Sequence, residues 1–111
     1  MSESKSKMAL LNRNLRILVK TGKIVMGEKN VLRQLRTGQM KLLIIADNLP
    51  EPYKNKLLHH VSLQNRKIEV FTYPGSSIDL GNQAGRPHMV GAIGVEQAGD
   101  SKIIDVVKEF S

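Results

Sequence analysis

The sequence predicts an α/β/α sandwich, in which helices cover both faces of a sheet of about four strands. Two observations carry this prediction. Segments with helical spacing of apolar residues alternate with short apolar segments of strand type, and the helical type comes first and last. With 111 residues, 41% of them hydrophobic, the chain is long enough for one core and too short for two. Helices that connect successive strands favour a sheet covered on both sides.

The first predicted element is an amphipathic helix that Thr21 and Gly22 end. Its inner stripe comprises Met8, Leu11, Leu15 and Leu18, and its outer stripe comprises Arg13, Arg16 and Lys20. Residues 1–7 are all polar after Met1 and include two lysines. We expect them to form a flexible basic tail, and residues 8–111 to form a single domain.

A short strand over residues 23–26 then stops at Gly27 and opens into a second helix, which Gly38 closes. The buried side of that helix comprises Val31, Leu32 and Leu35. The apolar run 41–46 is continuous, which predicts a central strand covered on both faces.

The rest of the chain predicts three helices and two strands. A third helix, with an inner face of Leu57, Leu58 and Val61, follows "DNLPEP" and extends to about Asn65. A strand of period two covers 67–73, with Ile68, Val70 and Thr72 on one side. The loop after it holds a short helix over 77–84, and a last strand covers 89–95. The final helix runs over Ile103, Ile104 and Val107, capped by Asp100 or Ser101.

Composition excludes several classes of protein. The chain has no cysteine, so a disulfide framework, a thiolate metal site and a cysteine nucleophile are excluded. No apolar run approaches the roughly 20 residues of a membrane-spanning helix. The start, "MSESKSKMALL", does not make a secretory signal. We expect a soluble cytoplasmic protein without a membrane partner.

The positive charge is concentrated in the first part of the chain. Through Lys41, ten Lys and Arg face two acids, which gives +8, whereas the remainder has seven against eight, which gives −1. This asymmetry favours a polyanion partner, nucleic acid above all. The alternative is a general solubilising charge.

The second predicted helix carries an anion-binding pattern. Lys29, Arg33 and Arg36 stand at i, i+4 and i+7, so they share one face. Gly27 allows close approach of a backbone, and the free amides of the first turn favour phosphate. The alternative is a solvated helix face in which Glu28 complements the helix dipole.

The remaining polar residues give no enzyme signal. "TGKIVMGEK" and "GNQAGR" match neither a phosphate loop of ATPases nor a dinucleotide fingerprint. The three histidines, His59, His60 and His88, lack metal-ligand spacing. Asp47 and Asn48 follow the central strand, where ligands gather in open α/β sheets, but they also suit a turn before Pro50. We therefore expect no catalytic residue, no metal, no cofactor and no small-molecule substrate.

Several segments together resemble a known family. A strand that ends at a glycine comes after "TGK". It is followed, in this order and with matching spacing, by "KLLIIADNLP", "GSSIDLGNQAGRPHMVGAIGV" and "EQAGDSKI". This ordered set resembles the L30e family of large-subunit ribosomal proteins, which belongs to the L7Ae superfamily of kink-turn RNA binders. The resemblance runs from about Leu10 to Ile104, and "GRPHMVG" is similar to the archaeal branch.

The resemblance implies an α/β/α sandwich with a four-stranded mixed sheet, and an RNA site built from three loops. These loops share one end of the sheet if the last strand runs antiparallel to the first two. By position, the site comprises Gly27, Glu28, Lys29, Asn30 and Arg33 from the first loop, Asp47 and Asn48 from the second, and Arg86, Pro87, His88 and Met89 from the third.

The resemblance also implies roles for these residues. A kink-turn crowds two phosphate backbones together and extrudes bases from the duplex. Lys29, Arg33 and Arg36 would offset the phosphate repulsion, while Asn30 and Asp47 would bind base edges. Pro87, His88 and Met89 would pack on an extruded base. Relatives commonly carry other residue types where Glu28 and Asp47 stand, and His88 replaces the bulky aromatic of eukaryotic relatives.

The expected function is that of a non-enzymatic component of the large ribosomal subunit, which binds ribosomal RNA and stabilises a kink-turn. Its partners would be ribosomal RNA and neighbouring ribosomal proteins, and the free chain would be a monomer. Two alternatives stay open. One is a kink-turn-binding subunit of an RNA-modifying or RNA-processing ribonucleoprotein, and the other is a small nucleotide-binding transferase that uses the loop from Gly75 to Gly81.

Overall fold

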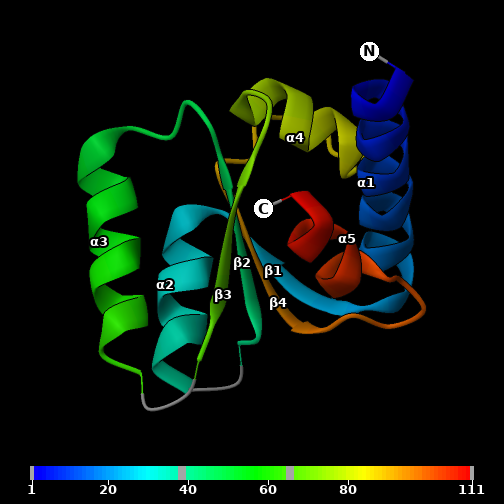
Figure 1. Cartoon of the computed structure of the whole chain (residues 1–111). Helices are drawn as coiled ribbons and strands as arrows, with labels where there is room; N and C mark the ends of the chain where they lie inside the picture. The colour runs from blue at the N-terminus through cyan, green and yellow to red at the C-terminus, as the bar shows by residue number, and fades with distance from the viewer. Residues whose placement is uncertain (1, 38–39, 65–66, 111) are drawn as a thin grey trace.

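The structure is a computed structural model that describes residues 2–37, 40–64 and 67–110, with side chains for 7–36, 40–64 and 67–109. Helices and strands alternate along the chain, as the apolar periodicity predicts (Figure 1). In chain order they are α1 (Ser2–Thr21), β1 (Lys23–Met26), α2 (Glu28–Thr37), β2 (Leu42–Ala46), α3 (Glu51–Ser62), β3 (Glu69–Tyr73), α4 (Ser77–Gln83), β4 (Ala92–Gln97) and α5 (Ile103–Phe110).

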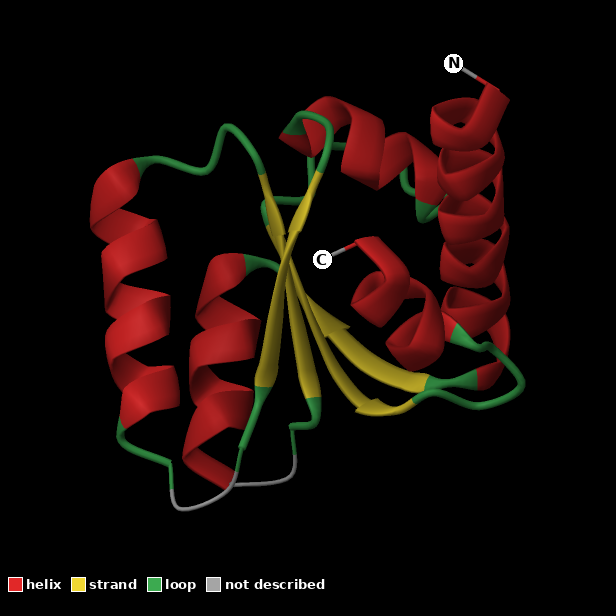
Figure 2. Ribbon diagram, viewed as in Figure 1, coloured by secondary structure: helices red, strands yellow, loops and turns green. Residues whose placement is uncertain are grey.

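The four strands form one mixed sheet in the order β1-β4-β2-β3. β4 runs antiparallel to both of its neighbours, whereas β2 and β3 are parallel and joined by α3. α2 and α3 cover one face of the sheet, and α1, α4 and α5 cover the other (Figure 1, Figure 2). The predicted α/β/α sandwich with a four-stranded mixed sheet is therefore confirmed.

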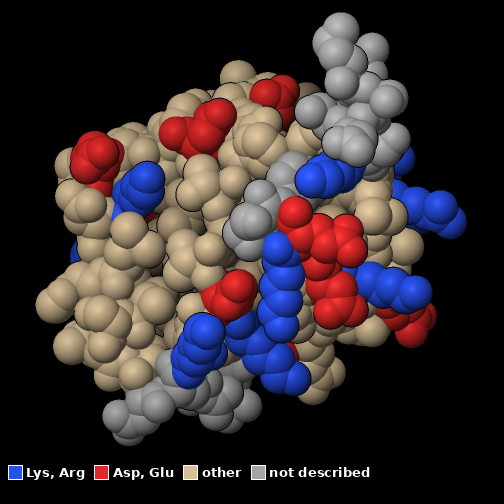
Figure 3. Space-filling model, in the orientation of Figure 1, with Lys and Arg blue, Asp and Glu red and all other residues tan. Residues whose placement is uncertain are grey.

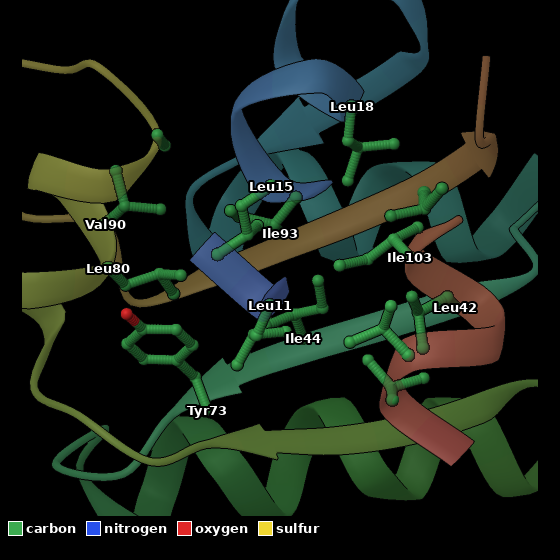
Figure 4. Packing of buried hydrophobic residues seen from close by; sticks show 14 of the residues in the cluster. Leu11, Leu15, Leu18, Leu42, Ile44, Tyr73, Leu80, Val90, Ile93 and Ile103 are labelled. Atoms are coloured by element: carbon green, nitrogen blue, oxygen red, sulfur yellow. The ribbon is translucent and has the colours of Figure 1, made fainter. Parts of the chain in front are cut away.

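The core consists of two apolar clusters, one on each face of the sheet. β2 is buried along its whole length and contributes to both of them. Leu42 and Ile44 belong to the cluster under α1, α4 and α5 (Figure 4), whereas Leu43 and Ile45 belong to the cluster under α2 and α3. Successive strand residues point to opposite faces, so a strand between two helical layers needs a continuous apolar run.

Side-chain hydrogen bonds fasten α1 to distant parts of the chain. Asn12 Oδ1 accepts a hydrogen bond from the hydroxyl of Tyr73 in β3 (2.7 Å). Asn14 Oδ1 accepts one from the backbone N–H of Lys102 (2.8 Å), just before α5. These bonds satisfy polar groups inside the larger cluster and fix α1 along the sheet.

The helix ends differ in part from the predicted ones. α1 begins at Ser2, six residues before the predicted start at Met8. Its opening residues, "SESKSK", include no glycine, proline or β-branched residue to interrupt a helix. That residues 1–7 are flexible stays a prediction. α3 ends at Ser62, and the predicted helix ends Asn65 and Gly38 lie outside the described residues.

The last strand begins at Ala92, so its predicted start at Met89 is wrong by three residues. The reason is tertiary, because the preceding segment is held by α4. The backbone N–H of Val90 donates to the carbonyl of Ser77, which is the first residue of α4 (3.0 Å). Pairing with β2 starts only at Gly91, whose carbonyl accepts from the Ala46 N–H (2.9 Å).

Candidate RNA-binding site

The three predicted loops lie together at one end of the sheet. β4 is antiparallel to β1 and β2, so its start lies beside their ends. Two backbone hydrogen bonds of 2.9 Å join the segments there, from Gly27 N–H to the Ala92 carbonyl and from Ala46 N–H to the Gly91 carbonyl. The geometric condition for a site built from these loops is therefore met.

Gly27 makes the turn from β1 into α2. Its φ of 88° lies in the left-handed region, which favours glycine. Its carbonyl accepts the N–H of Val31 (2.9 Å), the first hydrogen bond of the helix. The amides of the first turn have no acceptor within the helix, and the positive end of the helix dipole points the same way. The start of α2 therefore suits an anion or a base edge.

Asn30 lies in this first turn and is exposed. Its Nδ2 donates to the carbonyl of Met26 (2.9 Å). This bond holds the side-chain amide over the end of β1 through its nitrogen and leaves the amide oxygen, which is the acceptor, out of that bond. An amide held in this way can present an acceptor in a defined direction.

A hollow of about 390 Å³ lies between the first turn of α2 and the other two loops. Six of the predicted residues line it: Gly27, Glu28, Lys29, Asn30, Asn48 and Met89. The other four lining residues, which are Leu49, Pro50, Ser77 and Gly91, are not among the predicted ones. Leu49 and Pro50 directly follow the predicted residue Asn48, so their position in the sequence could have indicated that they line the site. Nothing in the sequence around Ser77 indicated this, because only the fold brings the start of α4 to the hollow.

The second loop is tied to the start of α4. Asn48 Oδ1 accepts the N–H of Ser77 (2.8 Å), and the N–H of Asp47 donates to the carbonyl of Gly75 (3.0 Å). Asn48 is thus both a turn-former and a wall of the hollow. The Asp47 side chain is exposed and does not line the hollow.

The third loop is held against α4 by a close backbone approach at Gly81. A Cβ on Gly81 would overlap the carbonyl oxygen of His88, so that only glycine fits at this position. The N–H of Arg86 also donates to the Gly81 carbonyl (2.9 Å). α4 itself begins with a capping box between Ser76 and Asp79. A defined platform therefore supports the loop.

The side chains of the third loop are exposed at this end of the molecule. Met89 is 65% exposed although it is apolar, and it borders the hollow. Arg86 Nε lies 3.2 Å from Met26 Sδ, so its guanidinium sits over the end of β1. His88 Nδ1 lies 3.1 Å from the carbonyl of Met89. Pro87, between them, is also exposed.

The basic face of α2 extends away from the hollow. Lys29, Arg33 and Arg36 are all exposed. Lys29 lines the hollow, and Arg33 follows one turn later. Arg36 lies eight residues after Glu28, about 12 Å along the helix axis. The fold therefore gathers Lys29 with the loops and leaves Arg36 at the far end of α2.

The described part of the chain offers neither a side-chain cluster for a metal ion nor a membrane-spanning helix. It contains no group of three or more His, Asp or Glu residues placed to hold a metal ion. None of the helices described has the length and apolar character needed to cross a bilayer. What the loop end does offer is cations, helix amides, side-chain amides and one exposed apolar group. This is a set suited to RNA.

The fold and the site define a small α/β/α protein with a basic loop end. The model of the ribosomal protein L7Ae/L30e/S12e/Gadd45 family matches residues 9–105, nearly the whole chain. The chain therefore belongs to this family, which confirms the resemblance found in the sequence.

Individual relatives agree with this assignment. The chain is 38% identical over 95 residues to the large ribosomal subunit protein eL30 of Saccharolobus solfataricus, with 86% of each chain covered. It is 39% identical over 101 residues to eL30 of Pyrobaculum islandicum, covering 91% of this chain and 98% of the relative. It is also 39% identical over 94 residues to eL30B of Schizosaccharomyces pombe, covering 85% and 79%.

A solved structure supports the fold independently. The structure of a protein with unknown function from Bacillus halodurans C superposes with a TM-score of 0.72 at 26% identity. The superposition covers 89% of this chain and 96% of that one.

Proposed function

We propose that this protein is a structural component of the large ribosomal subunit, which binds ribosomal RNA at its three loops and stabilises a kink-turn. The single observation that carries the proposal is the convergence of these loops around one hollow. The relatives named eL30 support the ribosomal assignment over a ribonucleoprotein of RNA modification or processing, and over an enzyme. The chain would then act at the ribosome in the cytoplasm, beside other ribosomal proteins, and be a monomer before assembly.

The physical task is to hold a bent RNA that phosphate repulsion disfavours. Lys29 and Arg33 are exposed next to the first turn of α2, where they offset the charge of crowded phosphates. Their contacts position the RNA without reading its sequence. Arg36, further along the helix, would neutralise the backbone of the adjoining stem.

The base-reading part of the site would be the hollow itself. Asn30 and the first-turn amides face base edges there, and Met89 offers an apolar surface on which an extruded base can pack. Pro87 and His88 extend this surface, and Arg86 adds a cation beside it. Asp47 would accept from a guanine amino group, and Glu28 would stay at the positive end of the helix dipole.

The test compares a labelled kink-turn RNA with a straight RNA duplex of equal length, titrated with the protein by fluorescence at several salt concentrations. We expect the wild type to bind the kinked RNA more tightly. In the K29A/R33A variant the kink-turn affinity should fall, and the slope of log affinity against log salt should shrink by about 2, one unit per lost phosphate contact.

K41A/K67A is the matched control, because it removes the same charge at the opposite end of the sheet, before β2 and β3. It should bind the kink-turn like the wild type. Equal affinity of the wild type for both RNAs, or an unchanged K29A/R33A variant, would contradict the proposal.

A further inference from the structure

α1 carries a second basic surface, on the opposite face of the sheet from α2. Arg13, Arg16 and Lys20 are exposed and stand at i, i+3 and i+7, so they form one stripe. The buried residues of α1 include Leu11 and Leu15, which point into the core. At 100° per residue, the stripe points almost directly away from these leucines and therefore outward to solvent.

The stripe borders a groove between α1 and α4. The groove has a volume of about 190 Å³ and is lined by Arg16, Val19, Lys20, Asn82, Gln83, Ala84 and Gly85. The Arg16 guanidinium donates through Nη2 to Gln83 Oε1 (3.0 Å), which orients its remaining N–H groups. The walls are thus formed by two cations and two side-chain amides, over a floor of small apolar groups.

This groove and the basic face of α2 lie on different sides of the molecule. The sheet separates α1 from α2 (Figure 1), and Lys29 lines the loop-end hollow, whereas Arg16 and Lys20 line the α1–α4 groove. Acidic side chains gather over α5, while Lys and Arg line the outer edge of α1 (Figure 3). The positive potential of α1 is therefore directed outward and toward α4.

The chemistry of the groove fits phosphate groups. Arginine, lysine and side-chain amides are the usual donors to the sugar–phosphate backbone. An acidic protein partner would normally also use a central apolar or aromatic anchor. The exposed large apolar residue of α1 in the described part is Leu10, which lines a separate depression with Arg13, Asn14, Ile17, Asp100 and Lys102 and does not line the α1–α4 groove.

We propose that Arg13, Arg16 and Lys20, with the α1–α4 groove, bind the phosphate backbone of a second RNA segment, distinct from the one at the three loops. The inference rests on the proposed function, since it assigns this protein two RNA contacts. The protein would then join two segments of RNA across its sheet. Recognition at the groove would be independent of sequence and strongly dependent on salt.

The test uses the full chain with one molar equivalent of unlabelled kink-turn RNA, which fills the tighter site at the loops, and a labelled straight RNA duplex is then added. We expect a ternary complex, because the groove stays free. The R16Q/K20Q variant should keep its kink-turn affinity and lose duplex affinity, with the salt slope of duplex binding smaller by about 1.8. The K41Q/K67Q variant loses the same charge elsewhere and should bind both RNAs like the wild type.

Three results would overturn the inference: displacement of the duplex by the kink-turn RNA, duplex binding by R16Q/K20Q equal to that of wild type, or poly-glutamate binding the groove as tightly as the duplex does. Failure of the proposed function is distinguishable, because it would abolish preference for the kinked RNA while duplex binding at the groove persisted. In K29A/R33A, duplex binding at the groove should be unchanged.

Discussion

Asn14 in α1 and Asn30 in α2 make the same local contact in two different regions of the molecule. Each donates from Nδ2 to the backbone carbonyl four residues earlier, over 2.9 Å in both cases. Asn14 is only 6% exposed, and its Oδ1 is occupied by the N–H of Lys102. Asn30 is exposed at the rim of the hollow.

The difference shows how one residue type in one local geometry takes two roles. Beside the larger core cluster, both the nitrogen and the oxygen of the Asn14 amide bond to backbone groups, which joins α1 to the residue before α5. At the start of α2, the same bond to Met26 only orients the Asn30 side chain, which is exposed and lines the hollow. Burial separates a structural residue from one available to a partner.

The largest expected effect is at Gly81, where the core and the loop end meet. In G81A, the added Cβ would overlap the His88 carbonyl, so α4 and the third loop must move apart. We expect the free energy of unfolding to fall by about 3 kcal/mol, together with a loss of kink-turn affinity. Thermal unfolding and RNA titration measure the two quantities. A G85A variant is a useful reference, since Gly85 has φ 74° but open space at its Cβ position. Equal losses in both would mean that the close approach is not the cause.

The asparagine pair gives the next effect. N14A removes a buried side-chain amide that bonds both the Leu10 carbonyl and the Lys102 N–H, so we expect a loss of about 2 kcal/mol in unfolding free energy. N30A should change that free energy by less than about 0.5 kcal/mol, because the position is exposed. Its kink-turn affinity should fall, whereas folded N14A should bind like the wild type. Chemical denaturation and RNA titration of both variants measure these effects. Similar losses of unfolding free energy in N14A and N30A would contradict the difference drawn between the two asparagines.

The smallest effect concerns Tyr73, whose buried hydroxyl donates to Asn12 in α1. Burial, and secondly the negative charge of Asp79, raises the pKa of Tyr73 above its ordinary value of 10.0. The unfolded chain therefore releases this proton first as pH rises. The stabilisation is fully present below pH 10.0 and is lost as pH rises through the higher folded pKa.

Y73F should cost about 1 kcal/mol at neutral pH through the lost hydrogen bond. It should also flatten the decrease in stability above pH 10.0. Denaturant titrations at a series of pH values measure both effects. Y53F is the control, since Tyr53 is exposed on α3. If the stability of Y73F decreased as steeply at alkaline pH as that of the wild type, groups other than Tyr73 would be responsible for the decrease.

The fold was predictable where local pattern decides it. The apolar run 41–46 became the doubly buried β2, and Gly27 stands where β1 turns into α2. The start of β4 was not predictable, since "MVG" reads as strand while Val90 is in fact bonded to Ser77 of α4. The strand pattern there competes with a contact between distant residues, and that contact prevails.

The candidate site was predictable in part. Lys29 could be selected from its place after a glycine at a helix start, and Asn30 and Met89 from the family resemblance. Ser77 was missed, because nothing in its own neighbourhood shows that Asn48, far along the chain, caps its N–H. Arg36 was grouped with Lys29 by helical spacing, yet the length of α2 separates them.

The sequence by itself determined the order of helices and strands, the two-sided burial of β2 and the excess of positive charge in the first part of the chain. Each of these depends on neighbours within a few residues or on composition. Only the tertiary structure decided that β4 runs antiparallel, that three loops therefore meet in one hollow, and that the basic stripes of α1 and α2 lie on opposite faces. The physical reason is that strand pairing and helix packing join residues far apart in the chain, and no local periodicity encodes which of them meet.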